Sequence, residues 1–181
     1  VVQGPQTAMV VGEGEIDCDE YGRILVRFHW DLAGANSMRC RVSQNWAGAG
    51  WGGMVIPRIG MEVVVEFLEG DPDKPVVMGC VYNGRNQVPY ELPDNRTRST
   101  FKTDTHQGKG YNELRFEDEK DAEEIFIHAQ RDMNGKIEQH RTERVNMNKV
   151  ESVGDSKASE VRNVFDQVVG GDMRISVGPA H

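Results

Sequence analysis

Hydrophobic residues recur every eight positions along the last quarter of the chain. The repeating positions are Ile137, Val145, Val153, Val161, Val169 and Val177. An α-helix turns by about 100° per residue, so an eight-residue repeat drifts by roughly 80° per copy and builds no single apolar stripe. A strand alternates faces with a period of two, so residues eight apart return to the same side. The pattern therefore predicts short β-strands joined by turns over residues 136–181.

Each of these octads offers little to bury besides its one β-branched residue. Charged side chains fill many of the other positions, and glycine follows the valine at Gly154, Gly170 and Gly178. About six extended residues span roughly 20 Å, which is one wall of a thin prism. The three walls can come from three successive octads of one chain or from three chains. Because one octad can bury only a narrow line, we favour a trimer whose repeated residues meet on the axis.

A charged, disordered tail is the alternative interpretation of this segment, but disorder does not require β-branched residues in register. One octad departs from the pattern. Val161 is followed by Arg162 rather than glycine, and Val164 and Phe165 add apolar bulk. This departure interrupts the regular prism expected at residues 161–168.

The first 85 residues alternate in the manner of a small all-β barrel. Strands are expected over residues 23–30, 38–44, 61–68 and 76–81, with a glycine-rich loop at residues 47–53. Turn residues separate them, including Gly22, the Gly70–Pro75 turn and Asn83-Gly84. About five short strands in this length suit a Greek-key barrel such as the OB-fold. Residues 1–85 are therefore predicted to form a five-stranded OB-fold barrel.

The segment between the barrel and the octads divides into two parts. Residues 86–110 contain Pro89, Pro93 and two glycines and are predicted to form an extended linker. Residues 111–135 contain two alternating runs and end at Asn134-Gly135, a strong hairpin signal, so a β-hairpin or neck is expected there. The whole chain is thus predicted to be all-β, ending in an octad-repeat β-helix over residues 136–181 that is cut off at its C-terminus.

The charge balance argues against a nucleic-acid partner. The chain has 21 Lys and Arg against 29 Asp and Glu, a net charge of −8. Residues 1–88 alone carry seven basic against eleven acidic side chains, whereas a phosphate-binding surface needs a basic excess. Trp30, Trp46 and Trp51 could still form a base-stacking platform, so an OB-fold protein that binds single-stranded nucleic acid remains the alternative function.

No pattern of catalytic or metal-binding residues stands out. The five histidines, His29, His106, His128, His140 and His181, lack the spacing of a zinc site, and no nucleotide-binding or nucleophile motif is present. A catalytic function for His29, His106 or His128 would require a cleft in which reactive side chains converge. The three cysteines are scattered and odd in number, which predicts small buried thiols without a disulfide. We therefore expect no catalytic, cofactor-binding or metal-binding residue and no enzymatic activity. No signal peptide or membrane-spanning run is visible.

Several short segments of the chain together point to one family. They are Asp19–Arg23, Val26–Asp31, Asn45–Gly48, Pro57–Gly60 with Glu62-Val63, Phe67–Pro75, Tyr82-Asn83, Tyr111–Phe116 and Ile127–Gln130. As a set they resemble the VgrG family, the tip proteins of the type VI secretion system. They occur in family order, with the octads where the family has its needle. The resemblance implies an OB-fold domain followed by a trimeric, interlocked β-helix.

The resemblance also implies a function and a set of partners. The implied function is a non-catalytic spike that caps the Hcp tube, punctures target envelopes and carries effectors. The implied partners are two further copies of the chain, the Hcp tube and baseplate, and a PAAR-type tip protein with its effectors. The family's hub domain, which docks on the tube, would precede Val1. The spike would assemble in the bacterial cytoplasm and then pass transiently through membranes into the target cell.

Overall fold

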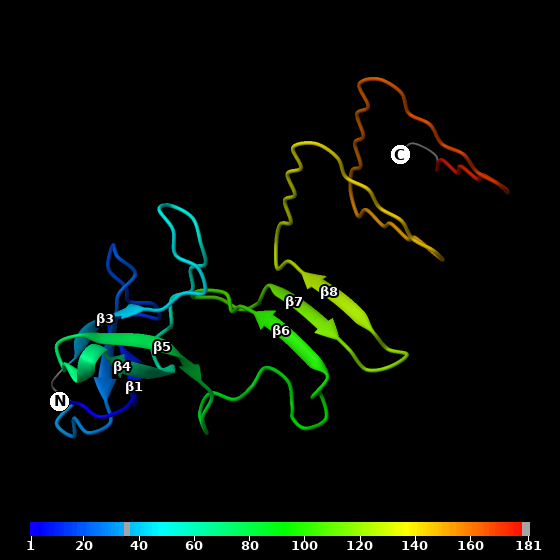
Figure 1. The fold of residues 1–181 in the computed structure, drawn as a ribbon. Coiled ribbons are helices and arrows are strands. Elements are labelled where there is room, and N and C mark those ends of the chain that lie inside the picture. The colour runs from blue at the N-terminus through cyan, green and yellow to red at the C-terminus, as the bar shows by residue number, and fades with distance from the viewer. Residues whose placement is uncertain (35–36, 179–181) are drawn as a thin grey trace. The chain divides into compact units, whose positions relative to one another are not determined.

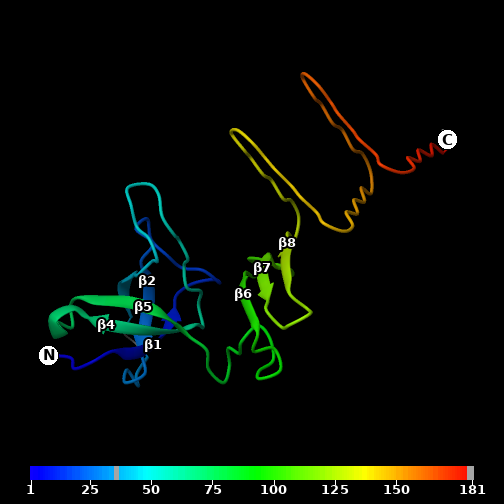
Figure 2. The ribbon, with the colours of Figure 1, turned by 45° about the vertical axis from the view of Figure 1, so that its right-hand side comes forward.

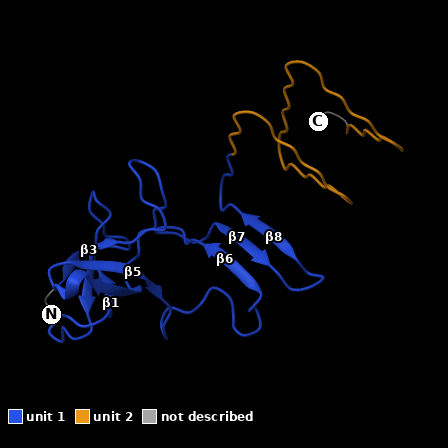
Figure 3. Cartoon of the chain, in the orientation of Figure 1, with its two compact units in different colours: residues 1–134 blue, residues 135–181 orange. Residues whose placement is uncertain are grey.

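The computed structural model describes residues 1–34 and 37–178 and is built from β-strands (Figure 1). His181, one of the histidines considered above, lies outside the described residues. The chain divides into two compact units, residues 1–134 and residues 135–181 (Figure 3). Within the described residues the only helical element is a short 3-10 turn, η1 (Leu68–Gly70). The all-β prediction is confirmed.

Five strands of the first unit close into a barrel. They are β1 (Gln6–Val11), β2 (Ile24–Phe28), β3 (Met38–Val42), β4 (Glu62–Phe67) and β5 (Pro75–Val81). Their order around the barrel is β1-β2-β3-β5-β4, with β3 and β5 parallel and the other neighbours antiparallel. The expected five-stranded barrel is confirmed, and several strand ends lie one or two residues inside the predicted limits.

The barrel interior is filled by β-branched side chains at alternate strand positions. On β4, Val63 and Val65 are buried and their neighbours are not, which is the period of two expected for a strand with one face inward. Val26 and Val77 are also fully buried. Each such side chain contributes about 1.5–3 kcal/mol by leaving water. This hydrophobic core holds the barrel together.

One of the three cysteines belongs to this core. Cys40 is fully buried, and burial raises the pKa of its thiol to about 11. Cys18 and Cys80 are exposed, so the expectation of small buried thiols is right for Cys40 and wrong for the other two. Cys18 lies outside the named strands, in an isolated bridge to Ile24, and Cys80 lies among the last four residues of β5, all of which are exposed.

A separate three-stranded sheet follows the barrel. Its strands are β6 (Arg98–Lys102), β7 (Glu113–Glu117) and β8 (Glu124–His128), antiparallel in that order. We call it the neck sheet. The prediction of an extended linker over residues 86–110 is therefore wrong in part, because β6 lies within it. The hairpin predicted over residues 111–135 becomes a three-stranded sheet through the addition of β6. The sequence of β6 has one large apolar residue, Phe101, so its strand state depends on pairing with β7.

The second unit contains the octads as extended segments and turns, coloured from yellow-orange to red in Figure 2. Over its described residues, 135–178, no strand is assigned, so the short strands predicted there are not present within one chain. The physical reason is that a strand needs a hydrogen-bonded neighbour, and successive octads of one chain do not pair.

Candidate trimer interface

The neck sheet has one bare apolar face. The strand register aligns Phe101, Leu114 and Ile127 in one cross-strand row. The next row on the same face aligns Ser99, Phe116 and Ile125. The five large side chains are 39–68% exposed. We call this set of five residues the apolar neck face. A contiguous apolar patch of this kind on an isolated chain indicates a surface that another protein covers.

The opposite face of the neck sheet is polar and already covered. Tyr90, from the segment before β6, donates a short hydrogen bond to the buried carboxylate of Glu113. The hydroxyl of Thr100 donates a second one at 2.8 Å, and Arg115 Nη1 donates to the Tyr90 hydroxyl at 3.0 Å. The Arg98 guanidinium lies 4.9 Å from the centre of the Tyr90 ring. The apolar neck face, by contrast, keeps its large side chains exposed.

Two carboxylates on this polar face are held in their charged form. Burial disfavours the charge on Glu113, but the hydrogen bonds from Tyr90 and Thr100 and the nearby charges of Lys102 and Arg115 together outweigh it, so its pKa lies below the ordinary value. The hydroxyl of Thr97 and then the guanidinium of Arg98, 2.8 Å away, lower the pKa of Glu117 to about 2. The polar face is thus organised around permanent charges at neutral pH.

The predicted axis residues differ in exposure from their neighbours in the octads. Ile137, Val145, Val153, Val161 and Val169 are 44–53% exposed, whereas Val150 and Val168, which are out of register, are 90% and 96% exposed. Val177, close to the end of the described residues, is also largely exposed. Within one chain, five of the six axis residues therefore share a half-sheltered environment, and each still presents apolar surface.

Ion pairs that repeat with the octad period connect successive octads. Glu143 and Lys149 approach to 2.8 Å, and Glu151 and Lys157, each eight residues further on, approach to 2.6 Å. The lysines lower the pKa of Glu143 and Glu151, each first through a side-chain hydrogen bond and then through its charge. The recurrence of Glu and Lys at intervals of eight residues is the sequence signal that could have predicted these pairs.

The histidines considered for catalysis do not converge. His29 Nε2 lies 3.7 Å from a carboxylate oxygen of Glu62 in the barrel. His128, in the neck sheet, places Nδ1 2.9 Å from the carbonyl oxygen of Tyr111 and stacks on the Tyr111 ring. Among the described residues, no group of three or more His, Cys, Asp or Glu side chains is arranged to hold a metal ion.

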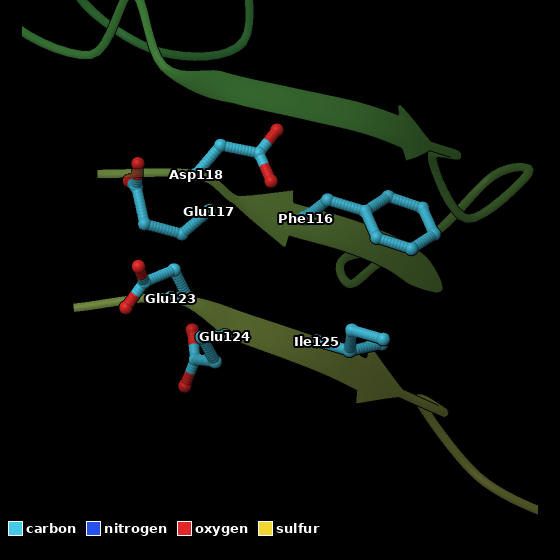
Figure 4. Close-up of a pocket in the computed structure, with 6 residues that line it drawn as sticks. All are labelled: Phe116, Glu117, Asp118, Glu123, Glu124 and Ile125. Atoms are coloured by element: carbon cyan, nitrogen blue, oxygen red, sulfur yellow. The ribbon is translucent and has the colours of Figure 1, made fainter. Parts of the chain in front are cut away.

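A shallow hollow of about 260 Å³ lies at the turn between β7 and β8 (Figure 4). Its lining residues are Phe116, Glu117, Asp118, Glu123, Glu124 and Ile125. These six residues supply four carboxylates and two apolar side chains, with no Ser, Thr, Cys, Lys or His among them. In the described residues there is also no helix long and apolar enough to cross a membrane.

Two known protein families match the chain, one over the barrel and one over the neck sheet and the octads. Residues 6–82 match the type VI secretion system/phage-baseplate injector OB domain, and residues 99–181 match the bacteriophage T4 gp5 C-terminal trimerisation domain. The second match contains almost the whole neck sheet as well as the octads. A barrel of the injector type followed by a trimerisation domain defines the class of the protein as a phage-baseplate-like injector component.

Individual relatives narrow the class to one family. The type VI secretion system spike protein VgrG4b of Pseudomonas aeruginosa is 52% identical over 168 residues, 89% of this chain and 21% of the relative. Spike protein VgrG1a of the same organism is 44% identical over 98% of this chain and 33% of its own length. The actin cross-linking toxin VgrG1 of Vibrio cholerae is 52% identical over 76% of this chain and 13% of its own length.

The chain belongs to the VgrG family of type VI secretion system spike proteins. The family and the fold expected from the sequence are confirmed. The chain spans between about a fifth and a third of the two Pseudomonas relatives that it matches.

Proposed function

We propose that this chain is a structural, non-catalytic part of a type VI secretion spike that acts as a homotrimer. The proposal rests on the injector barrel and on the segment after it, which matches a trimerisation domain. The strands at the start of that segment present the bare apolar neck face. The spike caps the Hcp tube, pierces the target envelope and carries effectors. Hcp, the baseplate, a PAAR-type tip protein and effectors are its proposed partners.

The proposed mechanism is mechanical. In the trimer, the three copies of Ile137, Val145, Val153, Val161, Val169 and Val177 meet on a common axis, and each octad pairs with octads of the other two chains. A buried backbone group without a hydrogen bond costs on the order of 1–3 kcal/mol. Continuous pairing between chains leaves no strand edge open to fray. Such a shaft resists local unfolding when it is pushed through an envelope.

The chain divides functionally into a barrel, a neck and a shaft. We assign residues 1–85 to the barrel, 86–135 to a neck that now includes β6, and 136–181 to the shaft. The neck joins its barrel through Arg58, whose guanidinium contacts the Glu15 carboxylate at 2.6 Å and the Asp104 carbonyl oxygen at 2.7 Å. The proposed site of action is the bacterial cytoplasm during assembly and the target cell after injection.

The proposed absence of catalysis concerns this segment. One relative is named an actin cross-linking toxin, and the match covers 13% of that protein. The match covers 76% of this chain. In the part of this chain that the structure describes, His29 and His128 contact different groups and no group of three or more side chains is arranged to hold a metal ion. We assign this segment to delivery.

Replacing Val153 by Asp in the bacterium that encodes this chain tests the proposed function. Three carboxylates would meet in a dry core, at a cost on the order of several kcal/mol per buried charge. The expected result is loss of type VI-dependent release of the Hcp tube protein into the medium. The matched control is Lys157→Glu in the same octad, which exchanges one exposed charge for another and should cost well under about 1 kcal/mol. Normal release with Val153→Asp would contradict the proposal.

A further inference from the structure

An uncharged arm stands off the barrel between β3 and β4. Residues 44–57 form this tryptophan arm, the cyan loop that projects from the barrel in both Figure 1 and Figure 2. Residues 42–57 contain no charged side chain, in a chain that is 28% charged. Trp46 and Trp51 are 65% and 58% exposed, and Met54 is 82% exposed. Exposed aromatic and Met side chains in one segment are typical of an interface.

The tryptophan arm is held in one conformation by its own hydrogen bonds. The Gln44 side chain bonds both backbone groups of Val55, at 2.8 and 3.0 Å. Gly48 N donates to Trp51 O and Gly53 N donates to Trp46 O, both at 2.8 Å. The two indole rings pack edge to face, with centroids 4.8 Å apart. The arm is therefore preorganised, and its apolar tip does not fold back onto its own barrel.

Glycine is required where the tryptophan arm closes around its rings. A Cβ atom on Gly48 would lie 2.2 Å from the Trp51 ring, and Gly52 has a φ of +141° with the Trp46 carbonyl oxygen 2.3 Å from its Cβ position. A side chain at Gly48 would displace the Trp51 ring, and a side chain at Gly52 would clash with the Trp46 backbone. Rigid aromatic anchors of this kind lose little entropy on binding another protein surface.

The base of the tryptophan arm adjoins the neck sheet. Arg58 follows the arm directly, and its guanidinium donates to Asp104 O in the connection between β6 and β7. Glu15 accepts from both Arg58 and the backbone N–H of Gln107 in the same connection. The arm therefore emerges beside the end of the sheet that carries the apolar neck face. In a three-fold trimer every contact is heterologous, so a projecting segment meets a different surface on the next copy.

We propose that the tryptophan arm of each copy packs against the neighbouring copy in the trimer, which extends the interface from the neck to the barrels. This inference rests on the proposed trimeric function. The second copy is the occupant because the arm is continuous with the neck that the trimerisation-domain match includes. The arm also carries no charged side chain. Two copies of this acidic chain can therefore meet at the arm without bringing like charges together. Trp46, Trp51, Met54 and Val55 supply the contact.

Thiol labelling of the full chain tests this arrangement. In a Cys18→Ser, Cys80→Ser background, which keeps the buried Cys40, one variant carries Met54→Cys and its matched control carries Leu32→Cys. Leu32 is a 95% exposed apolar residue of the same barrel. A bulky maleimide should label the thiol at position 54 at least about tenfold more slowly than the thiol at position 32, because the core of an interface excludes solvent. In urea the two rates should become equal.

The possible outcomes separate this inference from the proposed function. A trimeric protein that labels equally fast at positions 54 and 32 overturns the inference, because the arm then faces solvent or a different partner, and the trimer stands. A chain without these substitutions that sediments as a monomer overturns the trimer and the inference together. Loss of the trimer on Met54→Cys but not on Leu32→Cys supports the inference, since the arm contact is then needed for assembly.

Discussion

At the scale of single residues, Glu117 shows how the neck is held. Its carboxylate accepts hydrogen bonds from Thr97 and from Arg98, which bring the ends of β6 and β7 together. These partners favour the charged form, so the pKa falls from 4.5 to about 2. A charge stabilised in the folded state and not in the unfolded state couples folding to pH.

The pH dependence of this contribution follows from the direction of the shift. Because the folded pKa is lowered, the stabilisation by Glu117 is complete above about pH 4.5 and is lost as the pH falls towards about 2. Glu117→Gln should therefore lower the thermal stability of the neck at neutral pH, and the difference from the parent chain should shrink on acidification. Circular dichroism melts at several pH values measure this. Glu20→Gln on the barrel is the control, and a pH-independent difference for Glu117→Gln would contradict the assignment.

At the scale of the elements, the sequence predicted the strands whose own residues alternate between hydrophobic and polar. Residues 23–30 and 61–68 alternate clearly, and β2 and β4 lie inside those ranges. The strand β1 was expected only as one of about five and was not located, and β6 was assigned to a linker. Both become strands through pairing with distant segments, such as Thr100 with Arg115, which local pattern does not report.

The same limit explains which parts of the candidate interface could be predicted. The octad residues follow a fixed period, so they could be proposed as an axis from the sequence alone. The apolar neck face could not, because its rows combine one residue from each of three strands, and one strand was missing from the prediction. The tryptophan arm was expected as a barrel loop, but its rigidity depends on the Gln44 and glycine contacts seen in the structure.

Substitution on the apolar neck face tests its role in assembly. Ile127→Asp would place a carboxylate in each copy of a face that the trimer buries, at a cost on the order of several kcal/mol per charge. The expected result is a large shift from trimer to monomer, measured by size-exclusion chromatography with light scattering. Leu32→Asp adds the same charge at an exposed apolar position on the barrel and should leave the trimer intact. Equal behaviour of the two variants would remove the apolar neck face from the interface.

At the scale of the whole molecule, the single chain leaves three features without a partner. The apolar neck face, the axis residues and the tip of the tryptophan arm all present apolar surface, in a chain whose net charge is −8. The octads make no strand pairs over their described residues, although their backbone carries the usual donors and acceptors. A trimer resolves all of these features at once, since it supplies apolar cover, strand partners and a three-fold axis.

Sedimentation equilibrium of the intact chain at micromolar concentration is the most direct test of the trimer. We expect a single species with the mass of three chains that is stable to dilution. A folded monomer would leave the backbone N–H and C=O groups of its octads without strand partners, and each such group costs free energy when it is buried. A species with the mass of one chain at the same concentration would contradict the account and favour the prism built from successive octads of a single chain.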